Sequence, residues 1–170
     1  MFSHGKKLAE KGFTLVELLI VVIILAILAA IIIPQFTAAT DDATQSAYDT
    51  NVANIRSAID LYRQQHGDYP GAVTSSGGTC PAGSAAVAGA IGEPAFIAQL
   101  KNYTNAAGQA CTGTDVTFKY GPYLKDDLPT NPLGLNSTVT VVNTGILGLS
   151  TGSLGGWRFD SVTGEFIGDE

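Results

Sequence analysis

The sequence predicts an α+β protein in which one long N-terminal helix precedes a small antiparallel sheet. The helix is indicated by an uncharged apolar run from Leu18 to Ile33, and by apolar residues that continue at helical spacing as far as Tyr62. The sheet is indicated by short alternating or β-branched segments in the last third of the chain. The 170 residues are enough for one domain with a modest core.

The first part of the predicted helix is apolar enough to span a membrane. Phe13 to Ile33 forms a helix of about 31 Å, close to the roughly 30 Å of a hydrocarbon core. Beyond its first turn it is apolar on every face, as expected of a helix in lipid or inside a bundle. Lys6, Lys7 and Lys11 precede it and predict a cytoplasmic start with the C-terminal part outside. A plain single-span anchor is the simplest alternative.

Pro34 closes this anchor, residues 13–34. Proline has no N–H and its ring crowds the carbonyl four residues earlier, so we expect a kink just upstream. Residues 35–66 are predicted to continue as an amphipathic helix until Gly67 stops it. One stripe of that helix carries the apolar residues Tyr48, Val52, Ile55, Ile59 and Tyr62.

Residues 67–170 are predicted to form an exported head. A helical turn is expected at 94–103, and strands at 116–120 and 138–144. The segments GWRFD at 156–160 and EFI at 165–167 read as a hairpin around the turn SVTG. We expect the apolar face of this antiparallel sheet to cover the stripe of the helix.

The charge balance argues against nucleic acid as a main partner. Formal charge is −6, and loss of residues 1–12 leaves 6 basic against 14 acidic residues, a net charge of −8. Phosphate binding requires clustered Lys and Arg, which this chain lacks.

Glu17 places a carboxylate inside the apolar run. An acidic residue at mid-membrane costs about 2.5–3.5 kcal/mol, and less near the interface, so a bare anchor gains nothing from it. One explanation is a capping box, because Thr14 and Glu17 fit the S/T-x-x-E pattern at a helix start. The other is an ion pair with a neighbouring chain.

The string KGFTLVELLIVVIILAILAAIIIPQF closely resembles the start of type IV pilins and of the pseudopilins of type II secretion. The resemblance implies that residues 1–12 are a leader, cut after Gly12 by a prepilin peptidase that also methylates Phe13. It implies that Glu17 assists assembly by pairing with the amino group of Phe13 on a neighbouring subunit. It also implies a ladle-shaped fold. PYLKDDLPTNPLG and GGWRFDSVTGEF look like pseudopilin segments as well.

The function implied by this resemblance is that of a structural subunit in a homo-oligomeric filament. The precursor would sit in the bacterial inner membrane, meet an assembly platform there, and expose its head to the periplasm or the cell exterior. The alternatives are a major pseudopilin of type II secretion, or a minor tip subunit with an adhesive or DNA-binding role. A surface pilus is preferred over a pseudopilus because the chain has a cysteine pair and no clear calcium loop.

Cys80 and Cys111, the only two cysteines, both fall in the predicted exported part. An oxidising compartment favours a disulfide between them, with two separate buried thiols as the alternative. No CxxC is present, so neither a zinc site nor a dithiol redox motif is indicated.

Catalysis is not expected. Residues 148–152 satisfy G-x-S-x-G around Ser150, but that motif requires a strand before it, a helix after it and a histidine downstream. His4 and His66 both lie upstream, and we interpret His66 as a solvated residue at the helix end.

No cofactor is expected. Asp126 and Asp127 are weak candidates for a calcium site, with Asp160, Glu165 or Asp169 as distant partners. A solvated acidic surface is the favoured interpretation.

Overall fold

The computed structural model describes residues 12–169, in two compact units divided between Asp42 and Ala43. Helix α1, Leu15–His66, takes part in both units. Its assignment continues without interruption through Pro34 and ends one residue before Gly67, as expected. The kink at Pro34 stays a prediction.

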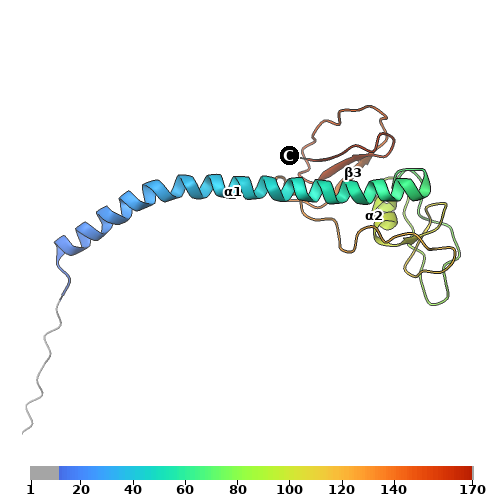
Figure 1. Ribbon diagram of the computed structural model, residues 1–170, viewed down its shortest axis with the longest axis horizontal. Helices are drawn as coiled ribbons and strands as arrows, with labels where there is room; N and C mark the ends of the chain where they lie inside the picture. Colours follow the sequence, from blue (N-terminus) through green and yellow to red (C-terminus); the bar gives the residue numbers. More distant parts are fainter. Residues whose placement is uncertain (1–11, 170) are drawn as a thin grey trace, which may run out of the picture. The chain divides into compact units, whose positions relative to one another are not determined.

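The second unit combines the later part of α1 with a short helix and two small sheets. Figure 1 shows α2 and β3 beside this part of α1. The elements are α2 Glu93–Lys101, β1 Tyr103–Thr104, β2 Ala110–Cys111, β3 Val139–Val142, β4 Trp157–Asp160 and β5 Phe166–Gly168.

The α+β class is confirmed, and the larger sheet has the order β3-β4-β5. Strands β4 and β5 form the predicted antiparallel hairpin, with Phe159 opposite Phe166. Strand β3 runs parallel to β4, with Val141 opposite Phe159, so this sheet is mixed. A parallel pair needs a crossover connection rather than a tight turn. Residues 143–156 provide that crossover.

The strand predicted at 116–120 is wrong. Only Tyr120 forms a bridge, to Thr104. The carboxylate of Asp115 accepts hydrogen bonds from the N–H groups of Thr117 and Phe118, both at 2.7 Å. Aspartate that bonds nearby backbone N–H groups competes with sheet pairing, and the segment becomes a turn.

The predicted stripe of α1 is the centre of the core. Val52, Ile55, Ile59 and Tyr62 are buried, and Tyr48 is half-buried. The opposing side chains come from α2 and the mixed sheet: Phe96, Leu100, Val139, Trp157, Phe159 and Phe166. The rings interlock, with centroids 4.9 Å apart for Phe96–Phe159 and 5.3 Å for Trp157–Phe166.

Polar side chains attach α1 to the last strand. Arg56 donates from Nε and Nη2 to the carbonyl of Phe166, at 3.1 and 2.7 Å. The N–H of Gly168 donates to the Tyr48 hydroxyl at 2.9 Å. Trp157 donates from Nε1 to the Pro129 carbonyl at 2.8 Å. These bonds satisfy polar groups at the edge of an otherwise apolar contact.

Phe159→Ala should lower the free energy of unfolding by about 3–5 kcal/mol, because it leaves a cavity where the sheet meets α1 and α2. Ile91→Ala, at an exposed position, is the control and should change it by less than about 0.5 kcal/mol. Urea unfolding of the full chain in detergent, followed by fluorescence of its single tryptophan, measures both. Equal effects of the two variants would contradict this account of the core.

Candidate functional site

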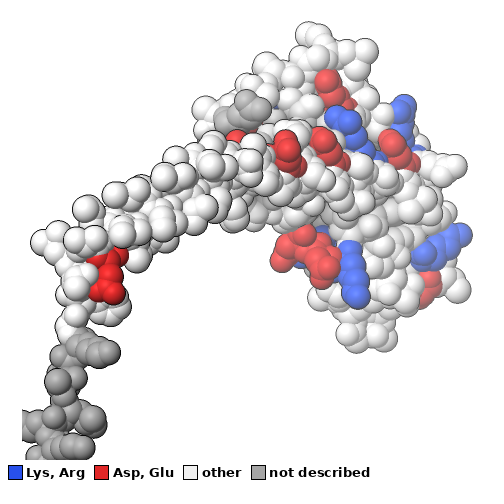
Figure 2. All heavy atoms as spheres, turned by 60° about the vertical axis from the view of Figure 1, so that its left-hand side comes forward, with Lys and Arg blue, Asp and Glu red and all other residues white. Residues whose placement is uncertain are grey.

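The first unit presents an apolar helix surface that nothing in the described chain covers. Every residue from Gly12 to Asp42 is exposed. Among the described residues, α1 is the one helix long and apolar enough to cross a membrane, and its most apolar part is not buried in the described chain. Figure 2 shows the surface of this segment almost free of charged side chains.

Glu17 and Thr14 form a reciprocal capping box at the start of α1. The carboxylate Oε2 accepts hydrogen bonds from the Thr14 N–H at 2.9 Å and from the Thr14 hydroxyl at 2.7 Å. The N–H of Glu17 donates to the Thr14 hydroxyl at 3.2 Å. Both bonds to the carboxylate use Oε2, so Oε1 makes no hydrogen bond within the described part of the chain. A carboxylate can accept about four hydrogen bonds, so a second role remains available to Glu17.

Gly12 and Phe13 precede the helix as irregular, exposed residues. Residues 1–11 of the expected leader, with Lys6, Lys7 and Lys11, lie outside the described residues, and so does His4. Cleavage after Gly12 and methylation of Phe13 therefore stay predictions.

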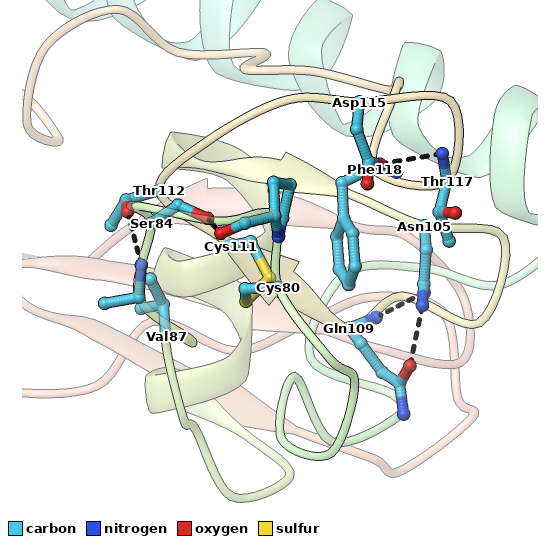
Figure 3. Close-up of a disulfide and its surroundings, with 12 residues drawn as sticks. Cys80, Ser84, Val87, Asn105, Gln109, Cys111, Thr112, Asp115, Thr117 and Phe118 are labelled. Atoms are coloured by element: carbon cyan, nitrogen blue, oxygen red, sulfur yellow. Dashed lines mark hydrogen bonds between the residues drawn. A yellow bond between two sulfur atoms is a disulfide. The ribbon is translucent and has the colours of Figure 1, made fainter.

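Cys80 and Cys111 form the predicted disulfide, with their Cα atoms 5.8 Å apart. Figure 3 shows how the bridge joins the loop after α1 to strand β2. Backbone hydrogen bonds join the same two segments. The N–H of Val87 donates to the Ala110 carbonyl at 2.9 Å, and the N–H of Thr112 donates to the Ala85 carbonyl at 3.0 Å. The bridge thus reinforces a loop that has little secondary structure of its own.

Replacing both cysteines by alanine should lower the free energy of unfolding by about 3–4 kcal/mol, because the two are 31 residues apart and the bridge restricts the unfolded chain. Urea unfolding of the full chain, with and without reductant, measures the loss. Thiol labelling of unfolded, unreduced protein is the control and should attach no label. Two labels per chain would refute the bridge.

His66 is not the solvated residue expected at the helix end. It is half-buried, and its ring stacks on Tyr62 with centroids 4.1 Å apart. Its Nε2 lies 3.0 Å from the hydroxyls of both Tyr123 and Thr104. Burial lowers the pKa of His66, which keeps the ring neutral near pH 7. These contacts give His66 a packing role between α1 and residues 103–123.

Ser150 lies exposed in the crossover between β3 and β4, without the strand-to-helix turn that a hydrolase nucleophile requires. His66, the one histidine in the described part, bonds elsewhere. The two calcium candidates, Asp126 and Asp127, are exposed, and Asp127 forms an ion pair with Lys101. No cluster of three His, Cys, Asp or Glu side chains suited to a metal occurs between residues 12 and 169.

The three distant partners considered for a calcium site have a structural role that the sequence analysis missed. Asp160, Glu165 and Asp169 hold the backbone of the crossover, residues 143–156. Glu165 Oε2 accepts hydrogen bonds from the N–H groups of Gly148 and Leu149, at 2.8 and 2.9 Å. Asp169 accepts from Gly152 and, at 3.2 Å, from Leu154. The glycine-rich sequence TGILGLSTGSLGG signals a loop but not its acceptors.

Asp160 connects this crossover to the hairpin turn. Its Oδ2 accepts hydrogen bonds from the Thr144 hydroxyl and from the N–H of Gly145, and its Oδ1 accepts from the N–H groups of Val162 and Thr163. Burial by itself raises the pKa of Asp160, but these hydrogen bonds outweigh burial and hold its pKa below the usual range.

Asp160→Asn should lower the free energy of unfolding by about 1–3 kcal/mol, because an amide cannot accept at both positions. The native pKa is below the unfolded value of about 3.9, so the carboxylate stabilises fully above that pH and less as pH falls through the native pKa. The difference between wild type and Asp160→Asn should therefore shrink below about pH 4. Denaturation at pH 7 and at low pH tests this, with exposed Asp126→Asn as the near-neutral control. A difference that stays constant with pH would contradict it.

Residues 7–33 match the family model described as the prokaryotic N-terminal methylation motif. Through this segment the chain is similar to proteins of the type IV pilin family. The matched residues include Gly12, Phe13, Glu17 and the start of α1.

Three relatives show the same similarity. The chain is 38% identical over 36% of its length to "Type II secretion system core protein G" of Pseudomonas aeruginosa, covering 43% of that protein. It is 52% identical over 35% of its length to "Type IV narrow pilus major component PilA5" of Thermus thermophilus, covering 52%. It is 41% identical over 40% of its length to "Fimbrial protein" of Neisseria meningitidis serogroup B, covering 40%. The chain thus spans about half or less of these relatives, and no solved structure matches it.

Proposed function

We propose that this chain is the structural subunit of a type IV pilus-like filament. A prepilin peptidase would remove residues 1–12 and methylate Phe13. The processed chain would stay in the inner membrane through α1 until an assembly platform there added it to a filament. The head would then lie in the periplasm or outside the cell.

One observation carries this proposal: within the segment that matches the methylation motif, α1 has a charge-free apolar surface from Leu18 to Ile33 that its own chain leaves uncovered. Such a surface needs lipid, or the same segment of other copies. Ala26, Ala29 and Ala30 offer small side chains that let helices approach closely. Transfer from bilayer to filament then replaces lipid contacts by helix contacts, at little cost in exposed apolar area.

A pseudopilus is the second candidate. It is favoured by the relative named "Type II secretion system core protein G". Both candidates are filament subunits built from the same helix, so they differ in the machinery that assembles them. Secretion of exoproteins by a strain lacking this chain, compared with surface filaments on the same strain, separates the two.

An unused acceptor on Glu17 supports a role in assembly beside its role in capping. Its Oε2 is used within its own chain, while Oε1 points to no partner there. After cleavage, the amino group of Phe13 on a neighbouring subunit would supply a cation for this carboxylate. Two charges that are costly alone in lipid are tolerated as a pair, and removal of one partner from such a buried pair costs about 3–5 kcal/mol.

Glu17→Gln and Glu17→Ala should both abolish filaments, because each removes the charge that the neighbour's amino group needs. Thr14→Ala keeps the carboxylate, loses part of the cap, and is the matched control that should still assemble. Filaments sheared from cells are counted by electron microscopy, beside processed protein in the membrane. Mass spectrometry should find the mature N-terminus at Phe13 carrying a methyl group.

Three results would contradict this proposal. Normal assembly of Glu17→Gln, with failure of Glu17→Ala, would show that Glu17 acts through its cap. A mature chain that begins at Met1 would show that residues 1–12 are not removed as a leader. Absence of filaments that contain the wild-type chain would refute the filament function.

A further inference from the structure

The head exposes an apolar tip formed by Ile146 and Leu147. Their side chains are 71% and 78% exposed, although both are large and apolar. They lie in the crossover between β3 and β4, with exposed Val162 close to Gly145. Neighbouring apolar side chains on a surface mark a contact site more often than isolated ones do.

Carboxylates hold the backbone on both sides of this tip. Before it, Asp160 accepts hydrogen bonds from the Thr144 hydroxyl and the N–H of Gly145. After it, Glu165 accepts from the N–H groups of Gly148 and Leu149. The tip is therefore presented on a fixed backbone. A fixed loop loses little conformational entropy when it binds, which favours association.

A hollow elsewhere on the head has a matching character. Its lining combines apolar and polar residues, and Val116 is 90% exposed. The lining residues are Asn105, Ala106, Ala107, Val116, Thr117, Lys119 and Tyr120. Its volume is about 450 Å³, three times the roughly 150 Å³ that suffices to hold a benzene ring in an apolar cavity.

The charges at the two places are complementary. Lys119 lines the hollow and lies over the Tyr120 ring, 5.2 Å from its centroid. Beside the tip, the carboxylate of Glu165 binds Gly148 and Leu149 and that of the buried Asp160 binds Gly145, and these two acidic groups outnumber Arg158, which lines the same crossover. A contact between tip and hollow brings an acidic group towards a basic one, which favours this pairing over contacts between identical patches.

The positions of the two patches suit an open chain of subunits. In Figure 1 the crossover after β3 and residues 105–120 lie on opposite sides of the later part of α1. A protruding patch on one side and a hollow on the other make a head-to-tail contact. Such a contact builds a helical filament when the rotation does not close a ring.

We propose that the Ile146–Leu147 tip of one copy docks into the Ala106–Val116–Tyr120 hollow of a second copy in the filament. This interface rests on the proposed filament function. It adds a contact between heads to the packing of α1, and it assigns the crossover between β3 and β4 a role in assembly.

Engineered cysteines test the contact directly, because both native cysteines are in the disulfide and leave no free thiol in the described chain. The full-length chain would carry Leu147→Cys together with Ala106→Cys, and sheared filaments would be oxidised mildly. Disulfides form only when Cα atoms approach within about 7 Å. We expect a ladder of dimers, trimers and longer species without reductant, which collapses to monomer when reduced. Peptide mapping should link residue 147 to residue 106.

Three controls define the alternatives. Each single cysteine variant should stay monomeric, and Leu147→Cys with Ile91→Cys, at another exposed apolar position, should give no ladder. Dimers from Leu147→Cys alone would show a contact between identical patches and overturn the proposal. Filaments of the double variant without any ladder would also overturn it, while leaving the filament function intact.

A second set of variants asks whether assembly needs the contact. Leu147→Asp and Val116→Asp should each reduce filament yield at least tenfold, while Ile91→Asp leaves it unchanged. All three positions are exposed, so the head should keep its Cys80–Cys111 bridge, checked by thiol labelling. Unchanged yield for Leu147→Asp would overturn the interface. Lack of filaments from the wild-type chain would refute the filament function and the interface together.

Discussion

The burial of one stripe of α1 determines the arrangement of the head. Val52, Ile55, Ile59 and Tyr62 are apolar on one face of a helix whose other faces are polar, and that face must be removed from water. The rings of the mixed sheet and of α2 cover it. Because these rings come from β4, β5 and α2, the stripe fixes where each of those elements lies. The bonds from Arg56 and Tyr48 to β5 then set the position of the last strand along the helix.

The earlier part of α1 has a different distribution of apolar residues. Between Leu18 and Ile33 the apolar residues are on all faces, so no single sheet could cover them, and the described chain leaves them exposed. An amphipathic segment can be satisfied within one chain, whereas a segment apolar all round requires lipid or other helices. The hydrophobic effect thus acts twice in α1, once to fold the head and once to associate the chain with its surroundings.

Three acidic residues of the head bind the backbone of one loop. Asp160, Glu165 and Asp169 accept hydrogen bonds from N–H groups in a glycine-rich crossover that makes few ladder bonds. Carboxylates are strong acceptors, and a loop rich in glycine has much conformational freedom to lose on ordering. The hydrogen bonds to these carboxylates offset the conformational entropy that the crossover loses. The ordered crossover allows β3 to run parallel to β4.

The sequence by itself determined the extent of α1, its buried stripe, the β4–β5 hairpin, the short helix α2 and the cysteine pair. Each depends on local periodicity, on a turn signal or on the count of one residue type. Only the tertiary structure decided the turn at Asp115, the parallel strand β3, the burial of His66 and the acceptor roles of Asp160, Glu165 and Asp169. These depend on partners that are distant in sequence or on side chains that outcompete a weak strand preference. The spacing of residues along the chain does not predict such contacts.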